Sequence, residues 1–439
     1  MKGDSDTIFA AATAPGRAGV AVVRVSGPEA DETIRQLTLR NVPAERIAVL
    51  RALFDPSTRV RIDVALILRF SAPNSYTGEN VAEFQIHGGR AVQSALFSAF
   101  AKIPRLRPAE PGEFTRRAVE NGRLDLTQAE AIADLVDAET ESQRRQAFRQ
   151  YQGHLAALYE DWRTRLIRSA AWIEAGIDFA DEDIPHEAIE KSRAALAILA
   201  EEIRIHLDDG RRGEILREGF HVAVMGAPNV GKSSLVNALA RRDVAIVSEI
   251  PGTTRDVIEV RLDLGGYPVI LADTAGLRTS QDPIEQEGVR RALARAEGCD
   301  LRLLVLDGAE EPLQAVPLRM GKEADVIVWN KADLTGERGH PGFWVSAKTG
   351  EGLGELIKTL AARAAGRLSA GEAPVLTRAR HRKALEDAEA ALLAALGTGE
   401  PELAAEHVRL ALRSIGRITG RVDLDELLDV VFRDFCIGK

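Results

Sequence analysis

The stretch GAPNVGKSS, residues 226–234, lies between the apolar run HVAVM and the helical run LVNALARR. A Gly-x-x-x-x-Gly-Lys-Ser loop between a strand and a helix is typical of a phosphate-binding loop. Its glycines let backbone amides and the helix N-terminus point at phosphate oxygens, while Lys232 adds positive charge and Ser233 offers a hydroxyl to Mg²⁺. We therefore predict a nucleotide-binding α/β domain around this loop. The expected contact residues are Asn229, Val230, Gly231, Lys232, Ser233 and Ser234.

A second motif, NKAD at residues 330–333, follows the apolar run VIVW and selects the base. Open parallel sheets bind their ligands at the carboxyl ends of the strands, and this motif falls at such an end. The Asp333 carboxylate can accept hydrogen bonds from N1 and the amino group of guanine, whereas adenine presents an acceptor at N1. Such a mismatch discriminates by about 10⁴, so the motif predicts GTP. The expected base-site residues are Asn330, Lys331, Ala332 and Asp333, with Ser346, Ala347 and Lys348 from the run VSAKTG.

Two loops between these motifs, IPGTTRD and ADTAGLR, are expected to respond to the γ phosphate. Thr254 is a candidate Mg²⁺ ligand, and Asp273 would hold the metal through water. Leu277 stands where a Ras-like enzyme carries the glutamine that orients the attacking water. Glu285 lies within loop reach and is the candidate replacement; by position alone, a solvated carboxylate at a helix start is equally favoured. The expected nucleotide contacts are Ser248, Glu249, Ile250, Pro251, Gly252, Thr253 and Thr254, then Asp273, Thr274, Ala275 and Gly276.

The texture of the chain changes three times. The runs GVAVVRVSG, RIDVALILRF and VAEFQIHGG predict strands of an α+β unit, whereas helical periodicity begins at about residue 127 and returns after the linker SAGEAP. Between the helical parts, strands and helices alternate as in a doubly wound parallel sheet. We predict an N-terminal domain at 1–119, a discontinuous helical domain at 120–215 and 373–439, and an inserted α/β domain at 216–372. The alternative is four independent modules in a row.

Composition narrows the class of protein. The chain has 439 residues, which suits about three domains, and no run approaches the roughly 20 apolar residues of a membrane span. The start lacks the pattern of a secretory signal, and two distant cysteines, Cys299 and Cys436, cannot form a disulfide scaffold. We predict a soluble cytoplasmic protein. A net charge of −9 argues against wrapping nucleic acid by bulk electrostatics, although it leaves room for a local basic patch.

Taken together, GAPNVGKSS, GTTRD, DTAGLR, NKAD and the terminal FCIGK resemble the MnmE or TrmE family of tRNA uridine-modifying GTPases. The front of the chain agrees, since DTIFAAATAPGRAGVAVVRVSG, NSYTGENVAEFQIHGG and RPAEPGEFTRRAVENGRLDLTQAEAIADL resemble that family's first segments. The resemblance covers the chain from end to end. It implies a folate-binding-like α+β domain, a discontinuous helical domain and an inserted Ras-like doubly wound P-loop GTPase domain.

The resemblance also implies how GTP is hydrolysed. In the family a potassium ion supplies the charge that an arginine finger gives elsewhere, and a glutamate at the position of Glu285 orients the water through an intermediary. Hydrolysis is coupled to dimerisation of the GTPase domains across the nucleotide. The implied K⁺ ligands are Asn229, Ser248, Ile250 and Thr253, and the implied Mg²⁺ ligands are Ser233 and Thr254.

For the N-terminal domain, the resemblance implies a constitutive homodimer that binds a tetrahydrofolate derivative, in the 5-formyl or methylene form. The matching residues are Arg24, Glu83 and Arg123, the last at a position where the family commonly has lysine. A carboxylate can take paired donors from the pterin, and arginine can meet a glutamate tail with two hydrogen bonds. Taken alone, Arg24 and Glu83 are more often surface positions. His87 is interpreted as a turn-capping or core histidine rather than a base.

The chain ends in RDFCIGK, an unusual place for a reactive side chain because termini commonly fray. If the helical domain folds back, Lys439 becomes a second cationic group of the folate pocket, and Cys436 becomes a thiol for one-carbon or redox chemistry. The alternative for Cys436 is a small buried side chain in the last turn. We interpret Cys299 as a packing residue.

The function implied by the resemblance is GTP hydrolysis within a complex that modifies uridine 34 of tRNA. The product would carry a 5-carboxymethylaminomethyl or aminomethyl group. The chain shows no flavin or NAD fingerprint, so a flavin-containing MnmG or GidA-type partner, joined in a heterotetramer, would supply redox chemistry. The alternative is a GTP-timed ribosome-assembly or RNA-binding switch, which predicts a basic RNA module that this acidic chain does not display.

Overall fold

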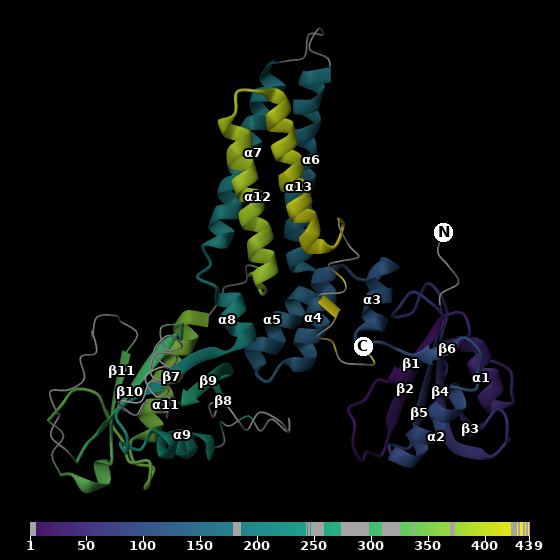
Figure 1. The fold of residues 1–439 in the computed structure, drawn as a ribbon, viewed down its shortest axis with the longest axis horizontal. Helices are drawn as coiled ribbons and strands as arrows, with labels where there is room; N and C mark the ends of the chain where they lie inside the picture. Colours follow the sequence, from purple (N-terminus) through teal and green to yellow (C-terminus); the bar gives the residue numbers. More distant parts are fainter. Residues whose placement is uncertain are drawn as a thin grey trace, which may run out of the picture. The chain divides into compact units, whose positions relative to one another are not determined.

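The chain is described by a computed structural model that divides into two compact units (Figure 1). The first comprises residues 1–133, 151–192 and 397–439, and the second comprises 134–150 and 193–396. The three domains predicted from the changes in apolar periodicity are a different division of the chain, and their boundaries stay a prediction. The structure describes residues 6–178, 186–242, 244, 246, 259–273, 298–309, 325–336, 339–368, 374–422, 428, 431–432, 435 and 438.

The first unit contains a six-stranded sheet with the order β3-β4-β5-β2-β1-β6, in which only β1 and β6 pair in parallel. The predicted strands in GVAVVRVSG, RIDVALILRF and VAEFQIHGG are confirmed as β2, β4 and β5. The strands are β1 (Thr7–Ala11), β2 (Ala21–Ser26), β3 (Val49–Phe54), β4 (Arg61–Phe70), β5 (Val81–Ile86) and β6 (Leu106–Pro108).

Side-chain alternation gives this sheet two different faces. Val23, Val25 and Phe84 are buried in a core that also takes Ile34 and Leu96 from two helices. These helices are α1 (Ala30–Thr38) and α2 (Arg90–Phe100). The intervening polar positions of β2 and β5 therefore face away from this core.

The other helices of the first unit follow the sheet in the chain. α6 and α13 run alongside one another (Figure 1), with Arg409 of α13 bonded to Glu174 of α6 at 2.9 Å. α13 begins with Pro401, whose fixed φ suits a first turn, and ends before Gly420. The helices are α3 (Glu113–Glu120), α4 (Leu126–Asp137), α6 (His154–Asp178) and α13 (Pro401–Thr419), with α4 ending and α7 (His186–Leu207) continuing in the second unit.

The second unit contains another six-stranded sheet, with the order β12-β11-β10-β7-β9-β8. All neighbours pair in parallel except β8 and β9, which form an antiparallel hairpin. The strand order reverses at β7 and β10, which is where doubly wound sheets bind ligands. The strands are β7 (Phe220–Met225), β8 (Glu259–Leu264), β9 (Tyr267–Asp273), β10 (Leu301–Asp307), β11 (Asp325–Asn330) and β12 (Phe343–Trp344).

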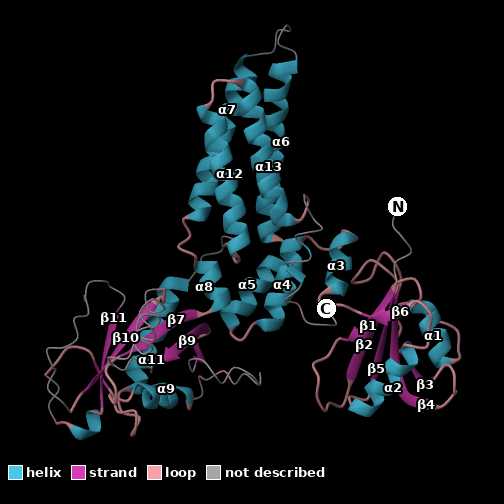
Figure 2. Cartoon of the chain, viewed as in Figure 1, coloured by secondary structure: helices cyan, strands magenta, loops and turns pink. Residues whose placement is uncertain are grey.

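Helices pack against this sheet and complete the second unit (Figure 2). Leu235 and Leu239 of α9 and Leu356 and Leu360 of α11 pack in the same core as the strands. The helices are α5 (Glu141–Tyr151), α8 (Arg212–Glu218), α9 (Lys232–Ala240), the single 3₁₀ turn η1 (Ala332–Leu334), α11 (Leu353–Leu368) and α12 (Ala379–Gly397). An α+β sheet, helical segments and a doubly wound α/β sheet confirm the predicted fold class.

The chain enters and leaves the α/β sheet through segments that contact each other. Asp134 accepts hydrogen bonds from Arg217 of α8 at 2.9 Å and from Arg378, before α12, at 2.7 Å. Arg382 of α12 bonds to Asp209 at 2.7 Å. Contact between the entering and leaving segments is the arrangement that an inserted domain requires.

No helix in the described part of the chain combines the length and the apolar character needed to cross a membrane.

Candidate functional site

The loop of residues 226–231 joins the carboxyl end of β7 to the start of α9. Gly226 approaches the Val305 carbonyl so closely that an added Cβ would lie 2.2 Å from its oxygen. Asn229 and Gly231 have positive φ angles of 65° and 91°, the left-handed region that asparagine and glycine tolerate best. These conformations curl the backbone over the helix N-terminus, as a phosphate-binding loop requires.

Lys232 places its ammonium group inside this curl. Its Nζ donates to the carbonyl oxygens of Gly226 at 3.0 Å and Ala227 at 2.9 Å, and the residue is only 8% exposed. Ser233 and Ser234, in the first turn of α9, are exposed at the same end of the helix. The loop thus combines a cation, backbone amides and hydroxyls at the helix N-terminus.

Asn330 connects the phosphate loop to the other motifs. The residue is 2% exposed, and its Nδ2 donates to the Val230 carbonyl at 2.8 Å. Its Oδ1 accepts the backbone amide of Ala347 at 3.1 Å. One buried side chain thereby holds together three segments that the sequence separates by about a hundred residues and by 17 residues.

Asp333 and Ser346 lie side by side at the same edge of the sheet. The Ser346 hydroxyl donates to Asp333 Oδ1 at 2.6 Å and holds the pKa of that carboxyl below its usual range. Asp333 is exposed and Ser346 is fully buried, so the carboxylate is ionised and held on a fixed support. Ala332 is buried beneath it, and Lys348 is exposed in the adjoining turn.

Lys331 makes an ion pair that the sequence analysis missed. Its Nζ lies 2.5 Å from Oδ2 of Asp307, whose side chain is 8% exposed. Asp307 ends β10 directly opposite Asn330 in β11. The signal was available in the sequence, because an aspartate at the end of the run LRLLVL is expected at the ligand-binding edge of a parallel sheet.

Several predicted residues lie outside the described residues. Asp273 ends β9 next to Val224 of β7, but its side chain is not described. The structure therefore neither brings together nor separates the predicted K⁺ set and the water-orienting glutamate. The residues outside the description are Ser248, Glu249, Ile250, Pro251, Gly252, Thr253, Thr254, Thr274, Ala275, Gly276, Glu285, Cys436 and Lys439.

A second polar site lies on the first sheet, on the face opposite α1 and α2. Arg24 of β2 and Glu83 of β5 are direct cross-strand neighbours. Arg24 donates through Nε and Nη2 to Glu83 Oε1, each at 3.0 Å, with side chains 20% and 18% exposed. Both residues are therefore half-buried in central strands of the sheet and not fully exposed on its surface.

Two aromatic rings, which the sequence analysis did not select, flank Arg24. Its guanidinium carbon lies 5.0 Å from the ring centroid of Tyr76 and 5.7 Å from that of Phe114, within cation–π range. Burial raises the pKa of Tyr76, whose hydroxyl shares a hydrogen bond with Thr115 at 2.7 Å. No sequence signal pointed to these rings, because they come from a loop and from α3.

Arg123 and His87 occupy exposed positions in the same unit. The side chain of Arg123 packs beside Gly78, two residues after Tyr76. His87 Nδ1 lies 2.7 Å from Asp63 Oδ1, and its side chain is 71% exposed. A core position for His87 is therefore excluded, and its backbone amide, which also bonds to Asp63 at 2.9 Å, fits the turn-capping interpretation.

The described residues near the chain end contact the N-terminal part of the first unit. Phe432 and Phe435 pack in one cluster with Val119 and Leu126. Gly438 lies so close to the carbonyl of Ala11 that a side chain would not fit there. In the second unit, Cys299 packs against Ala223 and Met225, as its interpretation as a packing residue predicts.

Comparison with known proteins agrees with this geometry. The model described as "MnmE helical domain" matches residues 126–436, and "GTP-binding protein TrmE N-terminus" matches residues 7–123. A tRNA modification GTPase MnmE of Parvibaculum lavamentivorans is 54% identical over 99% of this chain and 100% of the relative. The protein of that name from Paramagnetospirillum magneticum is 55% identical, again over 99% of this chain and 100% of the relative.

Solved structures of GTP-binding domains are also similar to parts of the chain. The G domain of the T. maritima FeoB iron transporter is 28% identical, covers 33% of this chain and 98% of its own, and has a TM-score of 0.26. Aquifex aeolicus Era is 26% identical, with 41% and 69% covered and a TM-score of 0.27. The two family models match most of the chain, and the two relatives are more than half identical to it over nearly its whole length. This chain therefore belongs to the MnmE family of tRNA modification GTPases.

Proposed function

We propose that this chain hydrolyses GTP as its part in the modification of uridine 34 in tRNA, and that potassium activates the hydrolysis. The observation that carries the GTPase assignment is the Asn330 side chain, which bonds to the phosphate loop and to the Ser346–Ala347 segment at once. Binding of the base and binding of the phosphates are thus supported by one buried group. Family membership supports the role in tRNA modification.

Guanine selection follows from the ionised Asp333. A carboxylate accepts hydrogen bonds and cannot donate them, so it fits the N1 and amino donors of guanine. The Ser346 hydroxyl fixes one carboxylate oxygen and keeps the group charged. With adenine, the acceptor at N1 would face the carboxylate without a proton between them, and binding would weaken strongly.

The loop residues fit the two cations that the family implies. Mg²⁺ and K⁺ prefer oxygen ligands, and the exposed Ser233 hydroxyl and Asn229 amide offer them at the phosphate loop. Asn229 is held there by its left-handed backbone. Thr254 would complete the Mg²⁺ ligands, and Ser248, Ile250 and Thr253 the K⁺ ligands. When bound, the cations would neutralise charge that develops on the transferred phosphoryl group.

The chain's own groups would prepare the reaction. Lys232 holds positive charge within the loop, and the amides at the start of α9 donate to phosphate oxygens. Glu285 would hold the attacking water through an intermediary, in place of the glutamine that Leu277 replaces. Closure of two GTPase domains across the nucleotide would exclude bulk water from the site.

Measuring GTP turnover in potassium and in sodium tests the potassium part. We expect turnover to collapse in sodium, and Glu285→Ala to abolish it in potassium with nucleotide affinity intact. Glu355→Ala, an exposed carboxylate of α11, is the control and should leave turnover unchanged. Equal rates in the two salts would contradict potassium activation, and full activity of Glu285→Ala would return that residue to a solvated carboxylate.

For the first sheet, we propose a tetrahydrofolate derivative as the ligand, in the 5-formyl or methylene form. Arg24 and Glu83 form a half-buried pair, and Arg123 lies near the Tyr76 loop, which together suit a molecule with both a planar heterocycle and a carboxylate tail. The contact of Gly438 with Ala11 supports a contribution from Lys439. In Cys436→Ser, hydrolysis should persist while tRNA modification stops; an unaffected product would leave Cys436 as a packing residue.

We propose further that the chain acts as a homodimer in the cytoplasm, with a flavin-containing partner of the MnmG or GidA type in a heterotetramer. The face of the sheet opposite α1 and α2 supports self-association, since Leu50 of β3 is 70% exposed there and Leu66 and Leu68 are half-buried. Mass spectrometry of the wobble base tests the assignment. Cells lacking the gene should lose the 5-carboxymethylaminomethyl-type modification; normal modification would favour the ribosome-assembly or RNA-binding switch.

A further inference from the structure

We propose that Arg117, through buried ion pairs with Glu79 and Glu113, positions Tyr76 and Phe114 around Arg24 and so prepares the arginine for its ligand. The inference rests on the proposed folate function and assigns three residues to that site that neither the sequence motifs nor the family resemblance selected. Arg117 is a positioning residue in this proposal, because it acts on the ligand through the two aromatic side chains.

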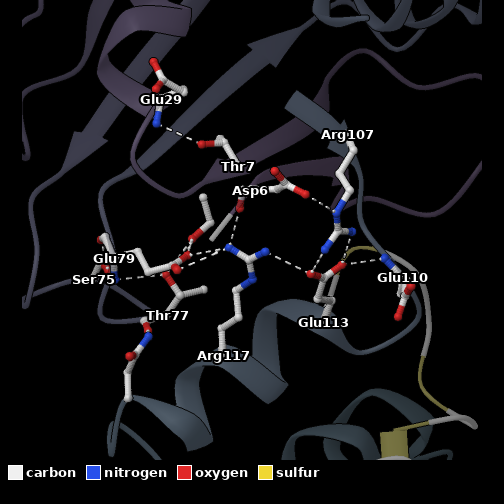
Figure 3. A network of polar contacts seen from close by, with 12 residues as sticks. Asp6, Thr7, Glu29, Ser75, Thr77, Glu79, Arg107, Glu110, Glu113 and Arg117 are labelled. Carbon is white, nitrogen blue, oxygen red and sulfur yellow. Dashed lines mark hydrogen bonds and ion pairs between the residues drawn. The ribbon is translucent and has the colours of Figure 1, made fainter. Parts of the chain in front are cut away.

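Arg117 is the centre of a buried polar network (Figure 3). Only 7% of the residue is exposed, and its Nη1 donates to the Asp6 carbonyl at 2.9 Å and to both Glu79 oxygens at 3.2 Å. Its Nη2 donates to Glu113 at 2.9 Å. Arg107 bonds to the same carboxylate at 2.6 and 2.9 Å. The guanidinium thus links Asp6, which directly precedes β1, to the 75–79 loop and to α3.

The loop of residues 75–79 is anchored by alternate residues. Glu79 accepts the Ser26 hydroxyl at 2.7 Å, Ser26 shares a hydrogen bond with Thr77 at 2.7 Å, and Ser75 bonds to the Glu79 carbonyl at 2.6 Å. Tyr76 stands between these anchored positions and contacts Arg24 instead. Fixing the loop therefore fixes the ring.

In helix α3, as in the loop, some residues belong to the polar network and their neighbours contact Arg24 or Tyr76. Glu113 and Arg117 are four residues apart and share one helix face, on which they pair with each other. Phe114, the residue after Glu113, reaches Arg24, and Thr115 bonds to the Tyr76 hydroxyl. The two elements that supply the rings are therefore the two elements that Arg117 clamps together.

The arrangement leaves Arg24 pre-oriented. Its Nε and Nη2 face Glu83, and the rings restrict the guanidinium plane. A side chain that is already ordered loses less conformational freedom when it binds, so pre-orientation strengthens binding. Arg117 in turn contacts Glu79 and Glu113 through two different nitrogens of its planar guanidinium. A lysine ammonium is a point charge and cannot reproduce this geometry, so the positioning depends on arginine at residue 117.

Binding of 5-formyltetrahydrofolate to the full chain, measured by calorimetry, tests the proposal. Arg117→Lys should keep a positive charge but bind the ligand at least tenfold more weakly. Arg116→Lys is the matched control, because Arg116 is the neighbouring, more exposed arginine of α3 and pairs with Glu120; its affinity should stay within twofold. If the parent chain itself binds no folate, the proposed folate function fails; if the parent and Arg117→Lys bind equally well, the positioning role fails.

A double-mutant cycle separates positioning from a general loss of structure. Tyr76→Phe keeps the ring but loses its hydrogen bond to Thr115 and should bind severalfold more weakly than the parent, whereas Tyr76→Leu, which loses the ring, should bind about tenfold more weakly. In Arg117→Lys combined with Tyr76→Leu, the losses should not multiply, because both act on the same ring. Fully multiplicative losses would overturn the proposal.

A milder variant keeps the test decisive if Arg117→Lys does not fold. Thr115→Val removes only the hydroxyl that meets Tyr76, and it should weaken folate binding severalfold without a change in melting temperature larger than that of Arg116→Lys. Unchanged affinity in both Thr115→Val and Tyr76→Leu would show that the rings do not serve the ligand, and the proposal would be wrong.

Discussion

Replacing Gly231 with alanine disturbs the point where the phosphate loop meets the base-binding motif. Gly231 has a φ of 91°, and an added Cβ would lie 2.3 Å from Nδ2 of Asn330. A real side chain cannot approach that closely, so Asn330 must move. Its movement would break the bonds to the Val230 carbonyl and from the Ala347 amide.

The magnitude follows from these two effects. Alanine in the left-handed region costs about 1–2 kcal/mol. The two hydrogen bonds of the buried Asn330 contribute about 1 kcal/mol each to stability. We therefore expect the free energy of unfolding to fall by about 3 kcal/mol. Displacement of Asn330 should also weaken nucleotide binding by at least about tenfold, equivalent to about 1.4 kcal/mol.

Thermal unfolding and titration with a fluorescent GDP analogue measure both consequences of Gly231→Ala. Gly366→Ala is the matched control, because Gly366 lies exposed in α11 with no atom within 4 Å of an added Cβ. Alanine favours a helix interior, so this variant should gain about 0.5–1 kcal/mol in stability and keep its GDP affinity. A Gly231→Ala protein that melts with the parent and binds GDP equally tightly would refute the reasoning.

Two further changes address charged contacts. Asp134→Asn removes the negative charge that accepts hydrogen bonds from Arg217 at 2.9 Å and from Arg378 at 2.7 Å. The free energy of unfolding should fall by about 1–3 kcal/mol. Limited proteolysis should therefore be faster than in the parent, and an unchanged digest would contradict this role. Burial alone would raise the pKa of Glu113, but hydrogen bonds, the strongest from Arg107, hold it below 4.5. The stabilisation by the Glu113 carboxylate is thus present above pH 4.5 and lost as the pH falls below that value. Glu113→Gln should be less stable than the parent at pH 7, and its melting temperature should depend less on pH in the acid range. Melting temperatures of variant and parent that change in parallel with pH would count against this prediction.

The sequence was sufficient to predict those features that depend on neighbours in the chain. The strand and helix on either side of the phosphate loop follow from apolar periodicity, and the loop's curl follows from its glycines. Asp333 and Ser346 were selected because their motifs occur in a fixed order, and the structure places them 2.6 Å apart. These features were predictable because the residues within each motif are close together in the sequence.

Features that depend on which strands become neighbours could not be predicted. Arg24 and Glu83 are 59 residues apart, and nothing in either run shows that β2 and β5 would pair in register. The network around Arg117 is similar, since it joins residues from a strand entrance, a loop and a helix (Figure 3). Charged residues in such segments usually face solvent, and only the tertiary packing buries these.

The β8–β9 hairpin lies between the two loops that are proposed to contact the nucleotide, and it is bonded to a helix of the second unit. The sequence places Thr254 ahead of β8 and Asp273 at the end of β9, so both loops continue into one hairpin. Its turn is bonded to α5, because the hydroxyl and the backbone amide of Ser142 both donate to the Gly266 carbonyl, the amide at 3.1 Å. Arg261 of β8 adds an ion pair with Glu139 at 3.0 Å.

These contacts continue towards the start of the α/β sheet. Gln143, next to Ser142, donates to the carbonyl of Arg217 at 3.1 Å, and that residue lies just before β7 and its phosphate loop. Residues 139–143 are therefore bonded both to the hairpin and to the segment that leads into the phosphate loop. Because the hairpin ladder and the segment before β7 are bonded to neighbouring residues of one helix start, a substitution that removes the Ser142 or the Gln143 side chain would loosen both attachments of α5 to the α/β sheet.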